Sequence, residues 1–281
     1  MNRPEQQQID QWFAVADKWI PRKQAKIASG EWKQATYHSL ALVHASFART
    51  KFLHGDSIDE VRTEFANTAR CILKSFTMAY DEKDPDYQGK KADWIEVAET
   101  IAIDGFDFAL MAADFSLAEA LAGWFRDRPD EMRMDSEVNR YAHALKHALL
   151  GGWQQARGFL KTQREAYQAK PSKRRDYRKN YYTLSTALLG ILDKNEPLFN
   201  EGLRMQLDLY QGDAQGGLKD TDEEFICDYA VALANLGLHH GLAVTVEHQT
   251  LPKGLMIQKV RMAQGPLCGP SNCQQPLMSA A

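Results

Sequence analysis

Apolar side chains recur every three to four residues along most of this chain, and this spacing constrains the fold more than any other feature of the sequence. Between Trp32 and Leu53, for example, Tyr37, Leu40 and Val43 lie on or near one face of a helix. Similar patterns return in about ten segments, and none has the alternation of a β-hairpin strand. The sequence therefore predicts an all-α protein whose helices form antiparallel hairpins, stacked as a bundle or a repeat-like array.

Several helix starts are marked by a Ser or Thr followed three positions later by Glu, a pair that can satisfy two free backbone N–H groups. These pairs are Ser57 with Glu60, Ser116 with Glu119, and Thr221 with Glu224. Pro21 is expected to begin a second short N-terminal helix, because Pro is well accepted at a first helical position. A central helix is expected over residues 93–114. The last long helix should run from Thr221 to about Gly237, and a short extended C-terminal hook should follow it.

Changes in composition suggest how the chain is divided. Residues 1–80 are expected to form an N-terminal helical hairpin region, and the polar segment 81–91 is the first plausible boundary. Residues 81–260 are expected to form the main helical region, continuous with the first. Residues 261–281, in which Gly, Pro, Gln and Ser dominate, should be a disordered tail. No fixed 34-residue signature of a repeat family occurs.

The bulk composition points to a soluble protein. Of the 281 residues, 44% are hydrophobic and 25% are charged, which is ordinary for a globular chain long enough to bury a core. No apolar run approaches the ~18 residues of a membrane helix, and the polar N-terminus lacks the apolar core of a secretory signal. The four Cys residues do not form the dense pattern of a disulfide scaffold. A cytoplasmic location and no membrane partner are expected.

Charge is unevenly distributed although the net charge is only −3. Residues 81–137 carry 16 acidic and 6 basic side chains, whereas residues 138–180 carry 2 acidic and 11 basic ones. Residues 193–229 are acidic again, with 10 acidic and 3 basic side chains. Blocks of this kind can steer a charged partner. Alternatively, adjacent helices of opposite sign can pair with each other.

Motifs that would indicate catalysis are missing from the sequence. His143 and His147 share a helix face at metal-ligand spacing, but the Glu that accompanies such a pair in zinc proteases is absent. His239 and His240 suit the negative end of a helix. Cys268 and Cys273 resemble half a metal site without a second half. With no Gly-rich phosphate loop and no nucleophile elbow, we expect no catalytic residue, metal or cofactor, and hence no enzyme.

A basic segment, residues 170–179, could be interpreted as a nucleic-acid site. Tyr177, Tyr181 and Tyr182 accompany its Lys and Arg residues, and such combinations stack on bases and neutralise phosphates. The overall charge is nevertheless negative, and tyrosines at helical spacing commonly belong to a core. A nucleic-acid partner is therefore not expected.

Three stretches in the C-terminal half carry a family resemblance: WQQARGFLKTQREAY at 153–167, the helix pair over 181–209, and ALANLGLHHGLAVTVEH followed by LPKGL. They are similar to the immunity protein 49 family, whose members are antidotes encoded beside polymorphic bacterial toxins. The resemblance covers residues 135–257 and, more weakly, the whole chain. The stretch FLHGDSIDEVRTEF also resembles helical immunity proteins paired with polymorphic nuclease effectors.

The resemblance implies an immunity protein that binds and neutralises a cognate toxin in bacterial competition. That toxin would be a secreted effector such as a nuclease, delivered by a type VI or contact-dependent system, and its active site would be occluded. An acidic surface could imitate the phosphates that a nuclease cleft binds. Candidate partner-binding residues lie in two acidic loops and one turn: Asp81, Glu82, Asp84, Asp86, Asp127, Asp130, Glu131, Asp135, Asp220, Asp222, Glu223 and Glu224.

Other functions remain open at this point. The chief alternative is a helical-repeat adaptor or scaffold that binds a host regulatory partner, and a small enzyme of another type is a third. Each acidic candidate can also be an ordinary solvated loop charge. The sequence leaves open whether the protein forms a homodimer.

Overall fold

Helices make up almost all the regular structure of this protein. The computed structural model describes residues 4–30, 33–126, 136–172 and 176–258, and within these ranges it has ten α-helices and no strand. The all-α fold predicted from the apolar periodicity is therefore confirmed. The helices are α1 (Gln6–Ser29), α2 (Lys33–His54), α3 (Ile58–Tyr80), α4 (Glu99–Met111), α5 (Phe115–Trp124), α6 (Ser136–Leu149), α7 (Trp153–Ala169), α8 (Tyr177–Leu192), α9 (Glu196–Ala214) and α10 (Asp228–His239).

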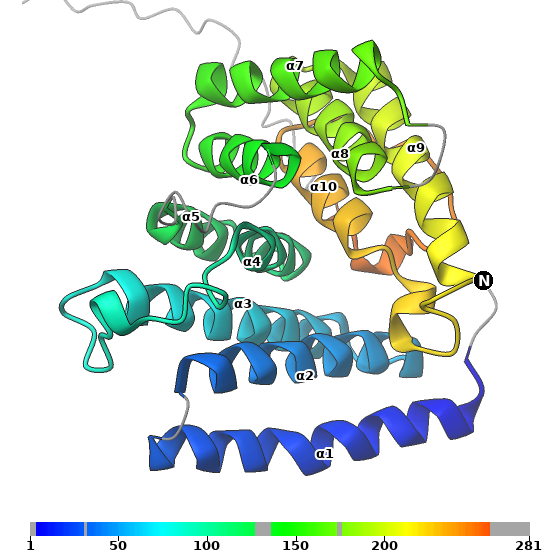
Figure 1. Ribbon diagram of the computed structural model, residues 1–281. Coiled ribbons are helices and arrows are strands. Elements are labelled where there is room, and N and C mark those ends of the chain that lie inside the picture. The colour runs from blue at the N-terminus through cyan, green and yellow to red at the C-terminus, as the bar shows by residue number, and fades with distance from the viewer. Residues whose placement is uncertain (1–3, 31–32, 127–135, 173–175, 259–281) are drawn as a thin grey trace, which may run out of the picture.

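Consecutive helices pack against one another in a stack. Helix α2 packs between α1 and α3, α3 packs on α4 and α5, and α6 packs on α4, α7 and α8. Figure 1 shows α1 to α7 following one another from the bottom to the top of the view, with α8, α9 and α10 beside the upper half. Short 3₁₀ turns η1 (Gly89–Lys91), η3 (Asp222–Phe225) and η4 (Lys253–Leu255) interrupt the connections. Within the described ranges, no helix combines the length and apolar character that a membrane crossing requires.

The centre of the protein is α4, which is covered on nearly every side. Eleven of its 13 residues are buried, and it packs against α3, α5, α6 and α10. One continuous apolar core extends from Ala41 in α2 to Leu255 in η4, so it spans both regions expected from the sequence. Because α4 also carries Asp104 and Asp107, its central position brings carboxyl groups into the interior.

Two helix starts predicted in the N-terminal half, at Pro21 and at residue 93, are wrong. Pro21 lies inside one 24-residue helix, α1, and does not begin a new one. Pro21 and Asp17 are both exposed, so the carbonyl that Pro leaves without a partner can be solvated. Helix α4 begins at Glu99 and not at residue 93, because turns and η1 occupy the chain before it.

Of the three predicted capping pairs, one is confirmed. Ser57 and Glu60 cap α3 reciprocally: the Glu60 N–H donates to Ser57 Oγ over 3.3 Å, and the Ser57 N–H donates to Glu60 Oε2 over 3.2 Å. The start of α5 is capped instead by Asp114, whose Oδ1 accepts from the Leu117 N–H over 3.0 Å. The cap predicted at Ser116 is therefore replaced by one at Asp114, two residues earlier in the chain.

The prediction that a helix starts at Thr221 is also wrong. This stretch forms the 3₁₀ turn η3, leaves helical geometry at Ile226 and enters α10 only at Asp228. Glu224 Oε2 accepts from the backbone N–H of Asp220 over 2.7 Å instead of closing a cap with Thr221. The backbone N–H of Cys227 bonds the Thr250 carbonyl over 2.8 Å, which holds the chain in an extended conformation between the two helices.

Residues 241–258 return over the helices as the expected hook. Asn200 on α9 holds the first part, donating to the Ala243 carbonyl over 2.9 Å and accepting from the Thr245 N–H over 2.7 Å. Asn235 on α10 is fully buried; it donates to the Leu110 carbonyl over 3.0 Å and accepts from the Ile257 N–H over 2.9 Å. The tail predicted over 261–281 lies outside the described residues.

Candidate functional site

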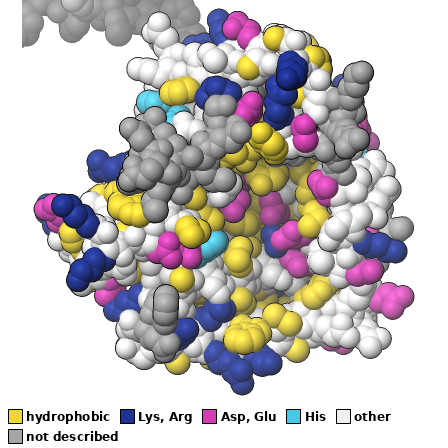
Figure 2. Space-filling model, viewed as in Figure 1, with side chains coloured by type: hydrophobic (Ala, Val, Ile, Leu, Met, Phe, Trp, Pro, Cys, Tyr) yellow, Lys and Arg dark blue, Asp and Glu magenta, His cyan; other side chains and the backbone are white. Residues whose placement is uncertain are grey.

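An open cleft of about 890 Å³ lies between α2 and α4 on one side and α8, α9, η3 and α10 on the other. Figure 2 shows the central recess, in which acidic and hydrophobic side chains alternate. Of the described residues that line it, seven are Asp or Glu and one is an Arg, with no Lys or His among them. The acidic residues are Asp104, Asp107, Asp176, Asp213, Asp222, Glu223 and Asp228.

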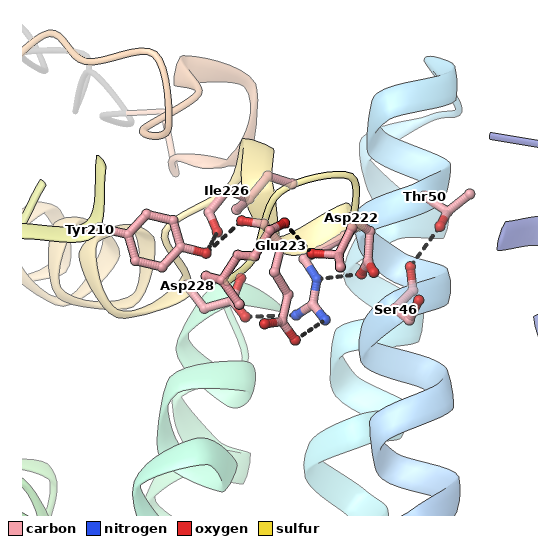
Figure 3. Close-up of polar contacts among 10 residues, drawn as sticks. Ser46, Thr50, Tyr210, Asp222, Glu223, Ile226 and Asp228 are labelled. Carbon is pink, nitrogen blue, oxygen red and sulfur yellow. Dashed lines mark hydrogen bonds and ion pairs between the residues drawn. The ribbon is translucent and has the colours of Figure 1, made fainter. Parts of the chain in front are cut away.

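Arg49 of α2 is buried and bonds three carboxylates at one wall of the cleft. Its Nε lies 2.7 Å from Asp222 Oδ2, its Nη1 lies 2.7 Å from Asp228 Oδ2, and its Nη2 lies 3.2 Å from Glu223 Oε1. Figure 3 shows Asp222 and Glu223 of η3 and Asp228, the first residue of α10, converging beside α2. One guanidinium thus faces three carboxylates, so this cluster has more acidic than basic groups.

The η3 segment is held in place by backbone contacts that explain the geometry of the Arg49 cluster. The hydroxyl of Tyr210 on α9 lies 2.5 Å from the Glu223 carbonyl oxygen and 2.8 Å from the Ile226 carbonyl oxygen. Asp220 adopts a positive φ of 65°, which turns the chain just before η3. The 3₁₀ turn therefore presents consecutive carboxylates, Asp222 and Glu223, to the same guanidinium.

Two further carboxyl groups of the cleft lining are not among the hydrogen-bond partners of Arg49. Asp104 and Asp107 are three residues apart on α4 and so share one face of the helix. Asp107 is only 2% exposed, and neither of its carboxyl oxygens has a hydrogen-bond partner among the described residues. In native proteins a buried polar group without a partner is uncommon and calls for an explanation.

Burial raises the pKa of three carboxyl groups in the cleft. Desolvation, reinforced by the nearby Asp228, raises the pKa of Asp104 to about 7. Desolvation and the charges of Asp104 and Asp228 raise the pKa of Asp107 well above its usual value. Desolvation raises the pKa of Asp228 to about 6, although Arg49 opposes the shift. A cation bound near Asp104 and Asp107 would therefore favour their ionised forms.

The mouth of the cleft exposes large apolar side chains, whereas its floor carries buried carboxyl groups. Leu42 of α2 is 54% exposed and Tyr177 of α8 is 50% exposed, and both line the opening. Asp176 caps α8 by accepting from the Lys179 N–H over 3.0 Å. Large exposed apolar side chains beside an acidic recess are features of a binding surface.

The sequence-predicted acidic residues lie in several places. Asp222 and Glu223 line the cleft, whereas Asp220 and Glu224 do not; the Asp220 N–H donates to Glu224 Oε2. The first acidic loop, which holds Asp81, Glu82, Asp84 and Asp86, is not part of the cleft. There Asp84 pairs with Lys74, and Asp86 pairs with Lys33 and Lys74. Asp127, Asp130, Glu131 and Asp135 lie outside the described residues.

Most of the residues that build the cleft were not singled out from the sequence. Arg49, Asp104, Asp107 and Asp228 each occur within segments whose apolar spacing predicts ordinary helices. A signal was present in α4, where two Asp residues interrupt an otherwise apolar run. Carboxyl groups in such a run must be buried with a partner, or as neutral acids, or beside a ligand.

Other motifs considered in the sequence have structural partners. His143 and His147 stack on Phe159, with ring centroids 5.7 and 5.9 Å away. His239 ends α10 and stacks on Phe115 at 3.8 Å. In the part of the chain that the structure describes, no three His, Cys, Asp or Glu side chains are grouped to hold a metal ion. Cys268 and Cys273 lie outside that part.

The basic segment 170–179 is partly engaged with its neighbours. Arg178 Nε lies 3.5 Å from Glu137 Oε1, and Tyr182 stacks on Tyr167 with centroids 4.4 Å apart. Tyr181 is buried in the core, while Tyr177 lines the mouth of the cleft. Residues 173–175 lie outside the described ranges.

Comparison with known proteins finds no match to this chain. No family model matches the chain, and neither a curated protein nor a solved structure matches it. The acidic cleft is therefore the feature from which a function can be argued.

Proposed function

We propose that this protein binds a basic protein partner in the acidic cleft and thereby neutralises it, as an immunity protein neutralises its toxin. One observation carries the proposal: among the described residues that line the cleft, seven are Asp or Glu and one is an Arg. A recess of one charge sign with low-dielectric walls concentrates field lines and accelerates association with a partner of opposite sign.

The mouth of the cleft favours a protein as the partner. Leu42 and Tyr177 are exposed large side chains on two different helices, and both border the acidic recess. Protein interfaces typically combine such apolar anchors with a few charged contacts in a desolvated pocket. A partner could place a Lys or Arg side chain in the recess and rest apolar surface on Leu42 and Tyr177.

The antidote role is the specific form of this proposal that the family resemblance supports. A nuclease toxin binds phosphates with basic side chains, and those side chains would be attracted to the carboxylates of the cleft. Binding there would cover the toxin's own active site without any reaction by the protein. A helical adaptor would use the same cleft but would not abolish a toxin's activity.

The test begins with a search for a toxin gene beside the gene of this protein, and any candidate found there is used as the partner. Co-expression of the two should restore growth, and the two proteins should elute as one complex from gel filtration. Absence of both rescue and complex would remove the antidote role. A stable complex that leaves the toxin active would indicate an adaptor instead.

A pair of matched variants locates the interface. Leu42→Arg places a positive charge at the mouth, so it should repel a basic partner and weaken binding at least tenfold in a surface plasmon resonance measurement. Leu150→Arg is the control, because Leu150 is 47% exposed, similar to Leu42 at 54%, but does not line the cleft. Equal affinity for the two variants would place the interface elsewhere.

A further inference from the structure

We infer that the floor of the cleft is a binding subsite for one organic cation, an alkylammonium or guanidinium group, with Asp107 as its counter-ion. The inference deepens the proposed function by naming the group that enters the recess, but its test does not require the partner. Asp107 is 2% exposed, lines the cleft, and has no hydrogen-bond partner for either carboxyl oxygen in the described structure. Such a group lacks the contacts that normally accompany a buried carboxyl.

Arg49 does not serve as the counter-ion of Asp107. Its three guanidinium nitrogens are occupied by Asp222, Glu223 and Asp228. No Lys and no second Arg is found among the described residues of the cleft lining. A positive charge that faces Asp107 from within the cleft would therefore come from a bound molecule.

The walls of the subsite suit an organic cation more than a metal ion. The rings of Phe108 and Tyr229 line the cleft near the carboxyl groups, and they offer apolar and cation–π contact to an alkyl chain that bears a charge. The described side chains do not form a cluster suited to a metal ion. Anions are disfavoured, because the described part of the lining carries seven acidic residues and one Arg.

Amides near the floor are already satisfied by each other. Gln206 Nε2 donates to Asn180 Oδ1 over 2.9 Å, and the Thr183 hydroxyl donates to Gln206 Oε1. These groups can shape the recess, but they do not reach Asp107 to neutralise it. Asp104, three residues before Asp107 on the same helix, is the second acid that a bound cation would face.

The subsite can be tested by isothermal titration calorimetry on the full chain. Butylammonium chloride and methylguanidinium chloride should bind saturably at one site, whereas 1-butanol, a neutral molecule of similar size, should not bind. Asp107→Asn keeps the shape of the side chain and removes its charge, so it should weaken butylammonium binding at least tenfold. Asp208→Asn removes an exposed charge of α9 outside the cleft and should change the affinity less than twofold.

The source of the cation is distinguished by two further probes. If the subsite receives a partner's side chain, Nα-acetyl-lysine methylamide should bind at least as tightly as butylammonium. If it receives a free amine, butylammonium should bind at least tenfold tighter than the lysine derivative. Both results support the subsite. Asp104→Asn serves as a second variant with the same expected direction should Asp107→Asn fail to fold.

Two outcomes separate this inference from the proposed function. Saturable amine binding without toxin neutralisation would leave the subsite standing and remove the antidote role. Toxin neutralisation without amine binding, or amine binding that Asp107→Asn leaves unchanged, would overturn the subsite.

Discussion

Arg49 connects the N-terminal helices to the C-terminal part of the molecule. The residue is 4% exposed, and three carboxylates bond its guanidinium. Burial alone would lower the pKa of Arg49, but the charges of Asp228, Asp222 and Glu223 outweigh burial and raise it. A bidentate or tridentate arrangement of this kind suits the planar fork of Arg and not the point charge of Lys.

Removal of this guanidinium should be costly. Arg49→Ala leaves three carboxylates close together without a counter-charge, and breaking a buried ion pair typically costs about 3–5 kcal/mol. Urea denaturation followed by circular dichroism measures the loss. Arg70→Ala is the control, because Arg70 is 56% exposed and lies 3.9 Å from Asp114, so its loss should cost less than about 1 kcal/mol. Similar midpoints for the two variants would contradict the structural role of Arg49.

The raised pKa of Asp104 makes stability dependent on pH. Because the folded pKa of about 7 exceeds the ordinary value of 3.8, the folded state binds the proton more tightly than the unfolded state does. The resulting stabilisation is complete below the unfolded pKa and is lost as the pH rises through about 7.

The unfolding free energy of the wild type should therefore fall, relative to that of Asp104→Asn, between pH 4.5 and 7. The difference can change by up to about 1.4 kcal/mol per pH unit. Urea titrations of both proteins across this range test the sign. Parallel curves would show that Asp104 titrates in the folded protein as it does in an unfolded chain.

At the scale of the elements, α8 and α9 approach each other unusually closely. A Cβ atom added to Gly190 would lie 2.3 Å from the Phe199 nitrogen, and one added to Gly202 would lie 2.2 Å from the Ala187 nitrogen. Because the obstructing atoms belong to the backbone, they cannot move aside as the end of a side chain can. Both glycines are thus required by the contact between the helices that carry Asn180, Gln206 and Tyr210 to the cleft.

Gly202→Ala should therefore destabilise the protein, despite the better intrinsic helix propensity of Ala. We expect a loss of about 1–3 kcal/mol, as for other overpacked cores. Gly158→Ala in α7 is the control, because a Cβ there meets nothing within 4 Å. That substitution should stabilise the protein by up to about 1 kcal/mol. Thermal unfolding of the two variants gives shifts of opposite sign if the close approach is real.

Individual helices could be predicted from sequence where local interactions decide. The α3 cap at Ser57 follows from neighbouring residues, and the pair that Ser57 forms with Glu60 predicts it. Predictions failed where a distant contact overrides the local pattern. Thr221 begins no long helix, since η3 turns its carboxylates toward Arg49 and a bond to Thr250 extends the chain at Cys227.

At the scale of the whole molecule, the cleft is assembled from residues far apart in sequence. Arg49 lies 173 positions before Asp222 and 179 before Asp228. Helical periodicity reports only on neighbours within a few turns, so it cannot reveal such a pairing. Two of the predicted acidic residues, Asp222 and Glu223, do line the cleft, whereas Asp84 and Asp86 pair with lysines of α2 and α3.

Asn235 joins three distant parts of the structure through one side chain. Its amide bonds the Leu110 and Leu255 carbonyls and the Ile257 N–H, so it links α4, α10 and the hook. Asn235→Ala leaves these buried groups without partners, and we expect a loss of about 2–3 kcal/mol.

Hydrogen exchange distinguishes local from global effects of Asn235→Ala. The Ile257 amide should exchange faster than the change in global stability explains, because its acceptor is removed. Asn67→Ala, which removes a 3.3 Å contact between neighbouring residues of α3, should leave Ile257 unaffected. Unchanged protection of Ile257 in Asn235→Ala would show that the hook is held by its apolar contacts alone.

The long separation between Arg49 and its carboxylates has a consequence for biosynthesis. A ribosome adds about 5–20 residues per second, so the acids of η3 emerge roughly 10–35 s after Arg49 does. Helices α1 to α3 can pack during that interval, with the guanidinium still hydrated at their surface. The Arg49 wall of the recess can therefore form only after η3 and α10 have been synthesised. A polypeptide that ends before them carries a positive charge without these partners where the finished protein is acidic.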